Sequence, residues 1–293
     1  MKILVFGSLN IDLIFDVDHI ALAGETISSH SMVKSAGGKG ANQAAALAKA
    51  GMKVFMAGKI GNDGGFLPEK LNGYGADTSR VMRYDGMTGQ AIIQLDKDGQ
   101  NAILLHSGGN GAITHGEIEN VIGGFDAGDL IVLQNEISGL KEIIELAHNK
   151  KMVICLNPSP YNEKIEELPL NMVNIFFVNE IEGAALAYSP QNCLLRDILD
   201  KLVLRFPAAE IILTAGEGGA FYGKGTYRAR SEIVEVPVVD TTAAGDAFTG
   251  YYIAARVKQM PVPLALKTAC KAAALTVSRR GAMDSIPYGD EVW

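Results

Sequence analysis

Short apolar runs alternate with longer segments of helical periodicity along most of this chain. The runs occupy residues 3–6, 54–57, 130–133, 153–156, 175–178 and 211–214, and the helical segments 40–50, 140–148, 194–206, 245–257 and 264–279. Runs of this kind are typical of strands buried on both faces, which occur in parallel sheets covered by helices. We therefore expect an α/β protein with three layers, α/β/α, around a mainly parallel central sheet.

Two segments interrupt this alternation, residues 11–36 and residues 87–106. In the second, the apolar stretches 89–95 and 101–105 flank Asp96-Lys-Asp-Gly99, whose glycine stands at a turn position, so a β-hairpin is predicted. We expect the two segments to form a small β-sheet lid inserted into one domain of residues 1–293. An ordinary hairpin at the sheet edge is the alternative.

Composition narrows the class of protein. The chain has 293 residues, 48% of them hydrophobic, and its 33 acidic against 26 basic residues give a net charge of -7. Without a basic run, a nucleic-acid partner is not expected. No apolar stretch has the length of a membrane span, and the chain opens on a strand, so we expect no membrane partner and a cytoplasmic location. Cys155, Cys193 and Cys270 have neither disulfide nor zinc spacing and are expected to be buried apolar residues.

The segment 236–252 carries the strongest sign of chemistry. A β-branched run ends in the small residues Ala243, Ala244 and Gly245, and Asp246 then opens an apolar, helix-like stretch. The N–H groups of a helix start favour phosphate oxygens, and small residues let a phosphate approach the backbone. A carboxylate at this place can accept a proton from an attacking hydroxyl. A helix N-cap is the alternative interpretation of the same aspartate.

Two polar segments lie near the amino end. After the first strand, Gly7-Ser-Leu-Asn10-Ile-Asp12 lacks the G-x-G-x-x-G of dinucleotide-binding folds, which argues against an oxidoreductase. Asn10 and Asp12 alternate on an extended segment, so they share one face and suit paired hydroxyls, unless they are solvated turn residues. Downstream, the glycine-rich segment 36–43 gives backbone room for a ligand, with Lys39 and Asn42 as donors, but its spacing is not that of a Walker P-loop.

Two later segments follow predicted strands. Asn179 and Glu182 are three residues apart at a helix start, where an amide and a carboxylate could orient hydrated Mg²⁺, and where a capping box has the same spacing. Thr214 and Gly216 follow the next buried run, where a hydroxyl and backbone amides could receive nucleotide phosphates. A tight turn between strands is the alternative there.

In this order, these segments resemble the ribokinase-like (PfkB) family of sugar kinases, from residue 7 to residue 287. Gly37-Gly-Lys-Gly-Ala-Asn-Gln43 is similar to the first family motif, and Asp240-Thr-Thr-Ala-Ala-Gly-Asp246 to the second. Asn179-x-x-Glu182 and Thr214-x-Gly216 lie between them. Ala243 stands where much of the family has glycine. The joint presence of these motifs makes coincidence improbable.

The resemblance implies a role for each residue. Asp246 would be the general base, with the amides of Ala243, Ala244 and Gly245 stabilising charge on the transferred phosphoryl group. The sugar would be bound by Asn10, Asp12, Gly38, Lys39, Asn42, Glu136 and Asp246. ATP would be bound by Asn179, Thr214, Gly216 and Gly245, and Mg²⁺, through water, by Asn179 and Glu182. K⁺ would be bound by Asp240, Thr242, Thr276, Gly281 and Ser285.

The expected reaction is transfer of the γ-phosphoryl of ATP to the primary hydroxyl of a free sugar. The intact first motif and the Asn10/Asp12 pair favour D-ribose at O5, while fructose, 2-keto-3-deoxygluconate, deoxyribose and nucleosides remain open as acceptors. No Arg or Lys cluster accompanies the sugar motifs, which argues against a phosphosugar. A sugar- or nucleotide-binding regulator without catalysis is the alternative from another class. Lid strands with exposed edges suggest a homodimer.

Overall fold

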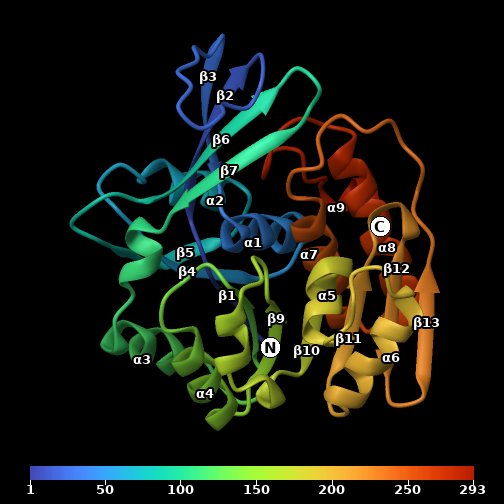
Figure 1. Cartoon of the computed structure of the whole chain (residues 1–293). Coiled ribbons are helices and arrows are strands. Elements are labelled where there is room, and N and C mark those ends of the chain that lie inside the picture. The colour runs from blue at the N-terminus through green and yellow to red at the C-terminus, as the bar shows by residue number, and fades with distance from the viewer.

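The computed structural model describes residues 1–293 and contains two sheets. The strands of the larger sheet are β1 (Ile3–Phe6), β4 (Val54–Ile60), β5 (Asp77–Arg83), β8 (Leu130–Gln134), β9 (Val153–Asn157), β10 (Ile175–Asn179), β11 (Glu210–Thr214), β12 (Ala220–Lys224) and β13 (Tyr227–Ser231). They lie in the order β13-β12-β11-β10-β9-β8-β1-β4-β5 (Figure 1). Neighbours are parallel from β5 to β11, and β12 and β13 are antiparallel. The six apolar runs are all strands of this sheet, as predicted.

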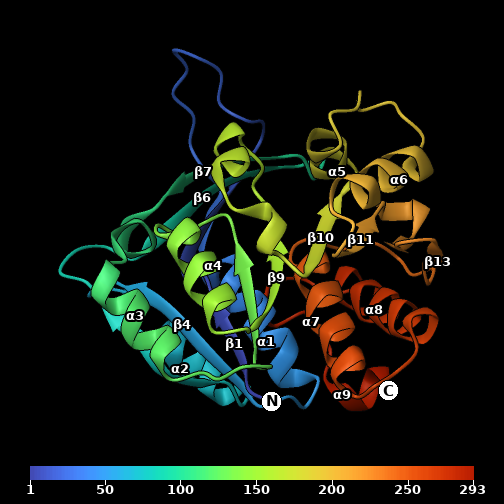
Figure 2. The same cartoon turned by 90° about the horizontal axis from the view of Figure 1, so that it is seen from below.

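Nine α-helices accompany the sheets: α1 (Lys39–Lys49), α2 (Phe66–Gly73), α3 (His115–Gly123), α4 (Leu140–Asn149), α5 (Glu180–Leu186), α6 (Leu195–Arg205), α7 (Ala244–Val257), α8 (Val262–Val277) and α9 (Gly289–Val292). Strand β1 shows how they form layers. Ile3 and Val5 belong to the hydrophobic cluster that includes side chains of α1, α2, α7 and α8, whereas Leu4 and Phe6 belong to the cluster that includes side chains of α3, α4, α5 and α6. Figure 2, seen from below, gives the second view of these layers. The three-layer α/β/α prediction is confirmed.

The smaller sheet is the lid. Its strands are β2 (Asn10–Val17), β3 (Ser31–Gly37), β6 (Gly89–Asp96) and β7 (Asn101–His106), in the order β3-β2-β6-β7. β2 and β6 are parallel, while β2–β3 and the predicted hairpin β6–β7 are antiparallel. Gly99 has a φ of 78° at the hairpin turn, a conformation that glycine adopts without strain. The lid projects from the body of the protein above α1 (Figure 1).

Some elements depart from the expectations. β5, β12, β13 and the helices α2, α3 and α9 were not predicted, because their segments lack a long periodic pattern. None of the helices combines the length and the apolarity that crossing a bilayer would require. Cys155 and Cys270 are buried as expected, but Cys193 is partly exposed, so the prediction was wrong for that residue.

Candidate active site

The loop before α7 places Asp246 in the first turn of that helix, as the sequence predicts. Ala243 caps the helix in the left-handed conformation, with φ 62°, and turns the chain into it. The backbone N–H groups of Gly245 and Asp246 have no acceptor within the protein, since intrahelical bonding begins at Ala247. A helix start with unbonded N–H groups favours an anion. The predicted anion site is therefore present as a geometry, next to a buried carboxylate.

The carboxylate of Asp246 is 7% exposed and is held by α1. Asn42 donates from Nδ2 to Oδ2 at 3.0 Å, and Gln43 donates from Nε2 to Oδ1 at 2.9 Å. The two helices approach closely because Gly250 of α7 has no side chain, and a Cβ there would lie 2.4 Å from the Cβ of Ala46. This close packing brings the two sequence motifs together.

Lys39 is the cation of the site. Burial favours its neutral form, but the carboxylates of Asp246, Glu136 and Glu182 outweigh burial and raise the pKa of Lys39. Burial also raises the pKa of Asp246, against the opposing effects of Lys39, Asn42 and Gln43. The pKa of Glu136 is raised by burial in the same way. The charge of one ammonium group therefore lowers the pKa of three buried carboxyl groups and helps to keep each of them ionised.

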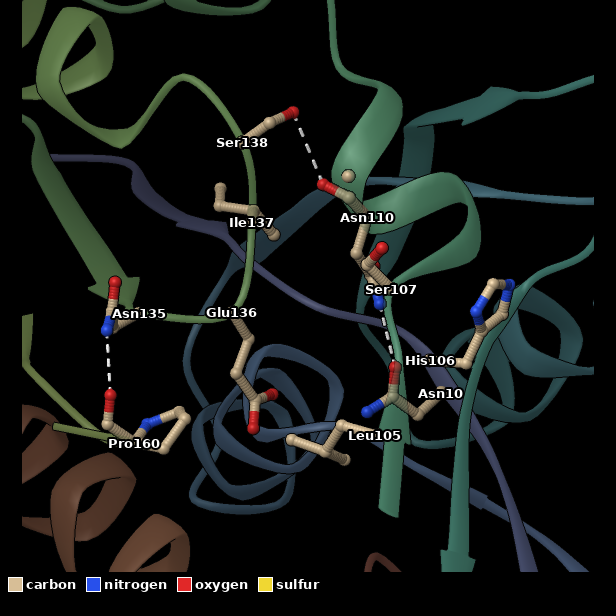
Figure 3. Close-up of a pocket in the computed structure, with 11 residues that line it drawn as sticks. Asn10, Leu105, His106, Ser107, Asn110, Asn135, Glu136, Ile137, Ser138 and Pro160 are labelled. Atoms are coloured by element: carbon tan, nitrogen blue, oxygen red, sulfur yellow. Dashed lines mark hydrogen bonds between the residues drawn. The ribbon is translucent and has the colours of Figure 1, made fainter. Parts of the chain in front are cut away.

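A cavity of about 380 Å³ lies between the lid and the loop after β8 (Figure 3). Asn10 and Glu136, both predicted to bind sugar, point into it. Asn10 Oδ1 accepts from Asn110 Nδ2 at 2.7 Å, so its own amide group is oriented by a residue that the sequence did not single out. Glu136 accepts from Ser8 Oγ and, at 3.2 Å, from the backbone N–H of Lys39. The other residues that line the cavity are Leu105, His106, Ser107, Asn110, Gly111, Asn135, Ile137, Ser138 and Pro160.

Asp12 lies on the same face of β2 as Asn10, as predicted, and is 8% exposed. Its carboxylate packs on Gly37, where a Cβ would lie 1.9 Å from Oδ2. Burial and the nearby charge of Glu136 raise the pKa of Asp12 to about 7, and no hydrogen bond from the chain opposes them. Gly38, next to Gly37, has a φ of 95°, and a Cβ there would lie 2.8 Å from the backbone N of Asn10, so both its conformation and its close contact require glycine. Asp12 thus presents buried acceptor oxygens without a donor.

The structure decides the geometry of Asn179 and Glu182. Asn179 Oδ1 accepts from the N–H of Glu182 at 2.9 Å, and Glu182 Oε2 accepts from the N–H of Asn179 at 3.1 Å, so the capping box is confirmed. Burial raises the pKa of Glu182, and the charge of Asp246 raises it further, while the backbone N–H of Asn179 and the charge of Lys39 lower it. Asn179 pairs with Thr214 in neighbouring strands, and Gly216 opens the short 3-10 turn Gly216–Gly218 after β11.

The segments expected to hold K⁺ meet beside α7. Asp240 accepts from the N–H of Thr242 at 2.9 Å and from the N–H of Gly281 at 3.0 Å, which joins the loop before α7 to the loop after α8. Thr276 and Ser285 are buried, and their hydroxyls donate to the carbonyls of Ala272 and Ala282 within their own segments. Asp240, Thr242 and Gly281 are therefore in direct contact, while Thr276 and Ser285 use their hydroxyl protons locally.

Sequence reasoning missed four polar residues of this region: Ser8, Gln43, Asn110 and Gln134. Gln43 stands inside the glycine-rich motif, which was the available signal for it. Ser8 lies in the turn after β1. Asn110 and Gln134 belong to no motif, and only the fold brings them beside Asn10 and Gln43.

Comparison with known proteins identifies the family of this chain. The model of the pfkB family carbohydrate kinases matches residues 1–288. A ribokinase of Staphylococcus aureus is 32% identical over 99% of this chain and 98% of its own length, and a deoxyribokinase of Salmonella typhimurium is 30% identical over 98% and 96%. The chain spans 55% of a 33% identical bifunctional ribokinase/ribose-5-phosphate isomerase A of Fructilactobacillus sanfranciscensis.

Among solved structures, the ribokinase of Arabidopsis thaliana complexed with ribose and ATP superposes with a TM-score of 0.88 at 29% identity. The match covers 99% of this chain and 97% of that one. Sequence and fold therefore both match this family over nearly the full length of the chain, and the two family motifs meet at Asp246. This chain belongs to the PfkB family and is an ATP-dependent carbohydrate kinase.

Proposed function

We propose that the whole chain, residues 1–293, forms one kinase domain that phosphorylates D-ribose at O5. The observation that carries this proposal is the buried carboxylate of Asp246, held by Asn42 and Gln43 beside unbonded N–H groups at the start of α7. The ribose and ATP of the Arabidopsis relative support the choice of acceptor and donor. The polar side chains that line the cavity between the lid and the loop after β8 support a hydroxyl-rich acceptor.

In the proposed reaction, Asp246 accepts the proton of the primary hydroxyl as the sugar oxygen attacks the γ-phosphorus. The bond between that phosphorus and the bridging oxygen breaks, and ADP leaves. The backbone groups of Ala243, Ala244 and Gly245 stabilise the charge of the transferred phosphoryl group, with the free N–H of Gly245 as the clearest donor. Positioning and charge stabilisation account for most catalysis of phosphoryl transfer.

The sugar completes hydrogen bonds that the protein leaves open. Asp12 has acceptor oxygens without donors, and Asn42 Oδ1 is buried with no partner. Buried acceptors of this kind are costly unless a ligand supplies donors, and sugar hydroxyls do so. Gly38, through its backbone, and Asn10, Lys39 and Glu136 complete the proposed sugar site.

The nucleotide is assigned to the other side of Asp246, along Asn179, Thr214, Gly216 and Gly245. No group of three or more His, Cys, Asp or Glu side chains could hold a metal by itself. The capping oxygens of Asn179 and Glu182 fit hydrated Mg²⁺ carried by the phosphates, which would neutralise charge on them. Asp240, Thr242, Thr276, Gly281 and Ser285 offer oxygens suited to K⁺, which would hold the loop before α7 in place.

We also propose a homodimer formed through the lid. The outer edges of β3 and β7 are not covered by another strand, and the exposed apolar side chains of this sheet include Met32, Val33, Ile103, Leu104 and Leu105. Uncovered edges with apolar side chains favour pairing with another chain. We expect light scattering to give twice the mass of 31.1 kDa, and Leu104→Asp to halve it. A monomeric wild-type protein at micromolar concentration would contradict this proposal.

The acceptor is tested by ADP release with Mg·ATP and K⁺. Ribose, deoxyribose, fructose, 2-keto-3-deoxygluconate and several nucleosides are compared as acceptors, and each ion is omitted in turn. We expect ribose to have the highest kcat/KM, by about tenfold or more over deoxyribose, because a polar site that binds a hydroxyl disfavours the analogue without it. A higher kcat/KM for deoxyribose would make deoxyribose the acceptor and leave the proposed mechanism unchanged. Binding of sugar and ATP without turnover would favour a regulator.

A further inference from the structure

Three buried polar side chains form a continuous row from the central sheet to Asp246. Gln134, at the end of β8, donates from Nε2 to Gln43 Oε1 at 2.6 Å, and Gln43 donates from Nε2 to Asp246 Oδ1 at 2.9 Å. Both glutamines are 0% exposed. The row joins three segments that are far apart in the sequence, and none of its three residues lines the cavity of Figure 3.

The charge on Asp246 determines how both amides point. An ionised carboxylate only accepts hydrogen bonds, so Gln43 must present its NH₂ group to Asp246. Its carbonyl oxygen then faces Gln134, which must present its own NH₂ group in turn. The last atom of the row, Gln134 Oε1, is buried without a hydrogen-bond partner. Both oxygens of the carboxylate therefore have hydrogen-bond donors, whereas Gln134 Oε1 at the other end of the row has none.

Close packing holds the far amide in place. A Cβ on Gly7 would lie 2.0 Å from Gln134 Oε1 and 2.8 Å from Gly40 Cα. The absence of a side chain at Gly7 thus lets β1, α1 and Gln134 lie in contact. Asn42, the other donor to Asp246, has no such support, because its Oδ1 is buried and unpartnered. Of the two donors to Asp246, only Gln43 has its amide oxygen held by a hydrogen bond from another side chain, that of Gln134.

We propose that Gln43 and Gln134 form a positioning relay, in which Gln134 fixes the amide of Gln43 and Gln43 fixes the orientation and ionised state of Asp246. This inference rests on the proposed function, because it takes Asp246 as the base. Gln134 touches neither the sugar cavity nor Asp246 and acts only through Gln43. Without Gln134, the Gln43 amide can rotate and turn its oxygen toward the carboxylate, which disfavours the ionised form.

The relay acts among other charged groups that face Asp246. These are Lys39 of α1, Glu136 after β8 and Glu182 of α5. Lys39 lowers the pKa of Asp246 while burial raises it, and the donated hydrogen bonds of Asn42 and Gln43 also lower it. Loss of one donor should therefore raise the pKa of Asp246 further. A base that must be ionised then loses activity at a higher pH on the acid side of the profile.

The test compares Gln134→Met, Gln43→Met and the double variant, with Val132→Ala as a matched control. Val132 is buried two positions before Gln134 in the same strand and belongs to the core cluster formed with α1 and α7, but its side chain has no polar atom that could act on Gln43 or Asp246. We expect each glutamine variant to lower kcat by roughly tenfold and to move the acid limb of kcat to higher pH by about half to one unit, with KM values changed less than about twofold. The control should leave the limb in place.

The double variant separates a relay from independent structural effects. Because Gln134 acts through Gln43, the double variant should be no slower than Gln43→Met alone. Additive losses, or a lowered kcat with an unmoved acid limb as in the control, would overturn the relay. Asp246→Asn is measured in parallel: if that variant keeps near-normal turnover, the base assignment fails instead, and the two failures are distinguishable.

Discussion

Asp246→Asn should lower kcat by about 10²–10⁴-fold, the usual contribution of a positioned base, with the fold and ATP binding retained. The substitution keeps the size of the side chain but removes the charge and one acceptor. Asn42 and Gln43 each donate to one oxygen of this carboxylate. The NH₂ group of an asparagine at position 246 would therefore meet the NH₂ group of either Asn42 or Gln43. The loss should therefore be carried by kcat rather than by the KM of ATP.

The measurement is steady-state turnover at saturating sugar and ATP, with ATP affinity by calorimetry and the fold by circular dichroism. Asp200→Asn is the matched control, because this carboxylate is 44% exposed on α6 and pairs with Arg228 away from the site. We expect the control to have wild-type kcat. Near-normal turnover of Asp246→Asn would remove the base assignment, and loss of both turnover and fold would make the variant uninformative about the base, in which case Asp246→Glu at unchanged fold decides.

Asp12→Asn should raise the stability of the sugar-free protein and lower its affinity for the sugar. The pKa of Asp12 is about 7 in the folded protein, against 3.8 for an ordinary aspartate. Between these values the native state binds a proton that the unfolded chain has released, so this group lowers stability progressively as pH rises from about 4 to about 7. Asparagine removes the buried charge. We expect the variant without sugar to be more stable than the wild type at pH 8, by on the order of 1–3 kcal/mol.

The same substitution should weaken sugar binding. Hydrogen bonds to a charged group contribute roughly 1.5–3 kcal/mol, so the KM of the sugar should rise by about 10–100-fold. Chemical denaturation at pH 4 and pH 8 measures the first effect, and kinetics at pH 8 the second. The gain in stability should vanish at pH 4, where Asp12 is protonated in the folded state. An equal gain at both pH values would show that charge burial is not its cause.

Several features of the fold and site were accessible from local sequence patterns. Apolar runs predicted the parallel strands because burial on both faces leaves no polar positions. The hairpin at Gly99 and the helix start at Asp246 were predictable because turn and cap chemistry act within a few residues. Asn10 and Asp12 share a face because side chains alternate along a strand. The antiparallel edge β12–β13 escaped prediction since its short strands carry mixed polar residues.

Other features depend on contacts between distant segments. The spacing of Asn179 and Glu182 is the same for a Mg²⁺ site and for a capping box, and only the folded backbone shows that the capping box is formed. Gln134 and Gln43 are 91 positions apart, and Gln43 and Asp246 are 203 apart. No periodicity links such positions. Their meeting depends on the packing of α1 against α7, which the missing side chain of Gly250 allows.

The sequence alone therefore determined the class of fold, the β6–β7 hairpin and the carboxylate at the start of α7, because each follows from burial or hydrogen bonding between residues close in the chain. The tertiary structure decided which donors hold that carboxylate, which buried acceptors have no donor within the chain, and which three carboxyl groups raise the pKa of Lys39. These are properties of distance and burial between elements. They exist only once the helices have packed on the sheet.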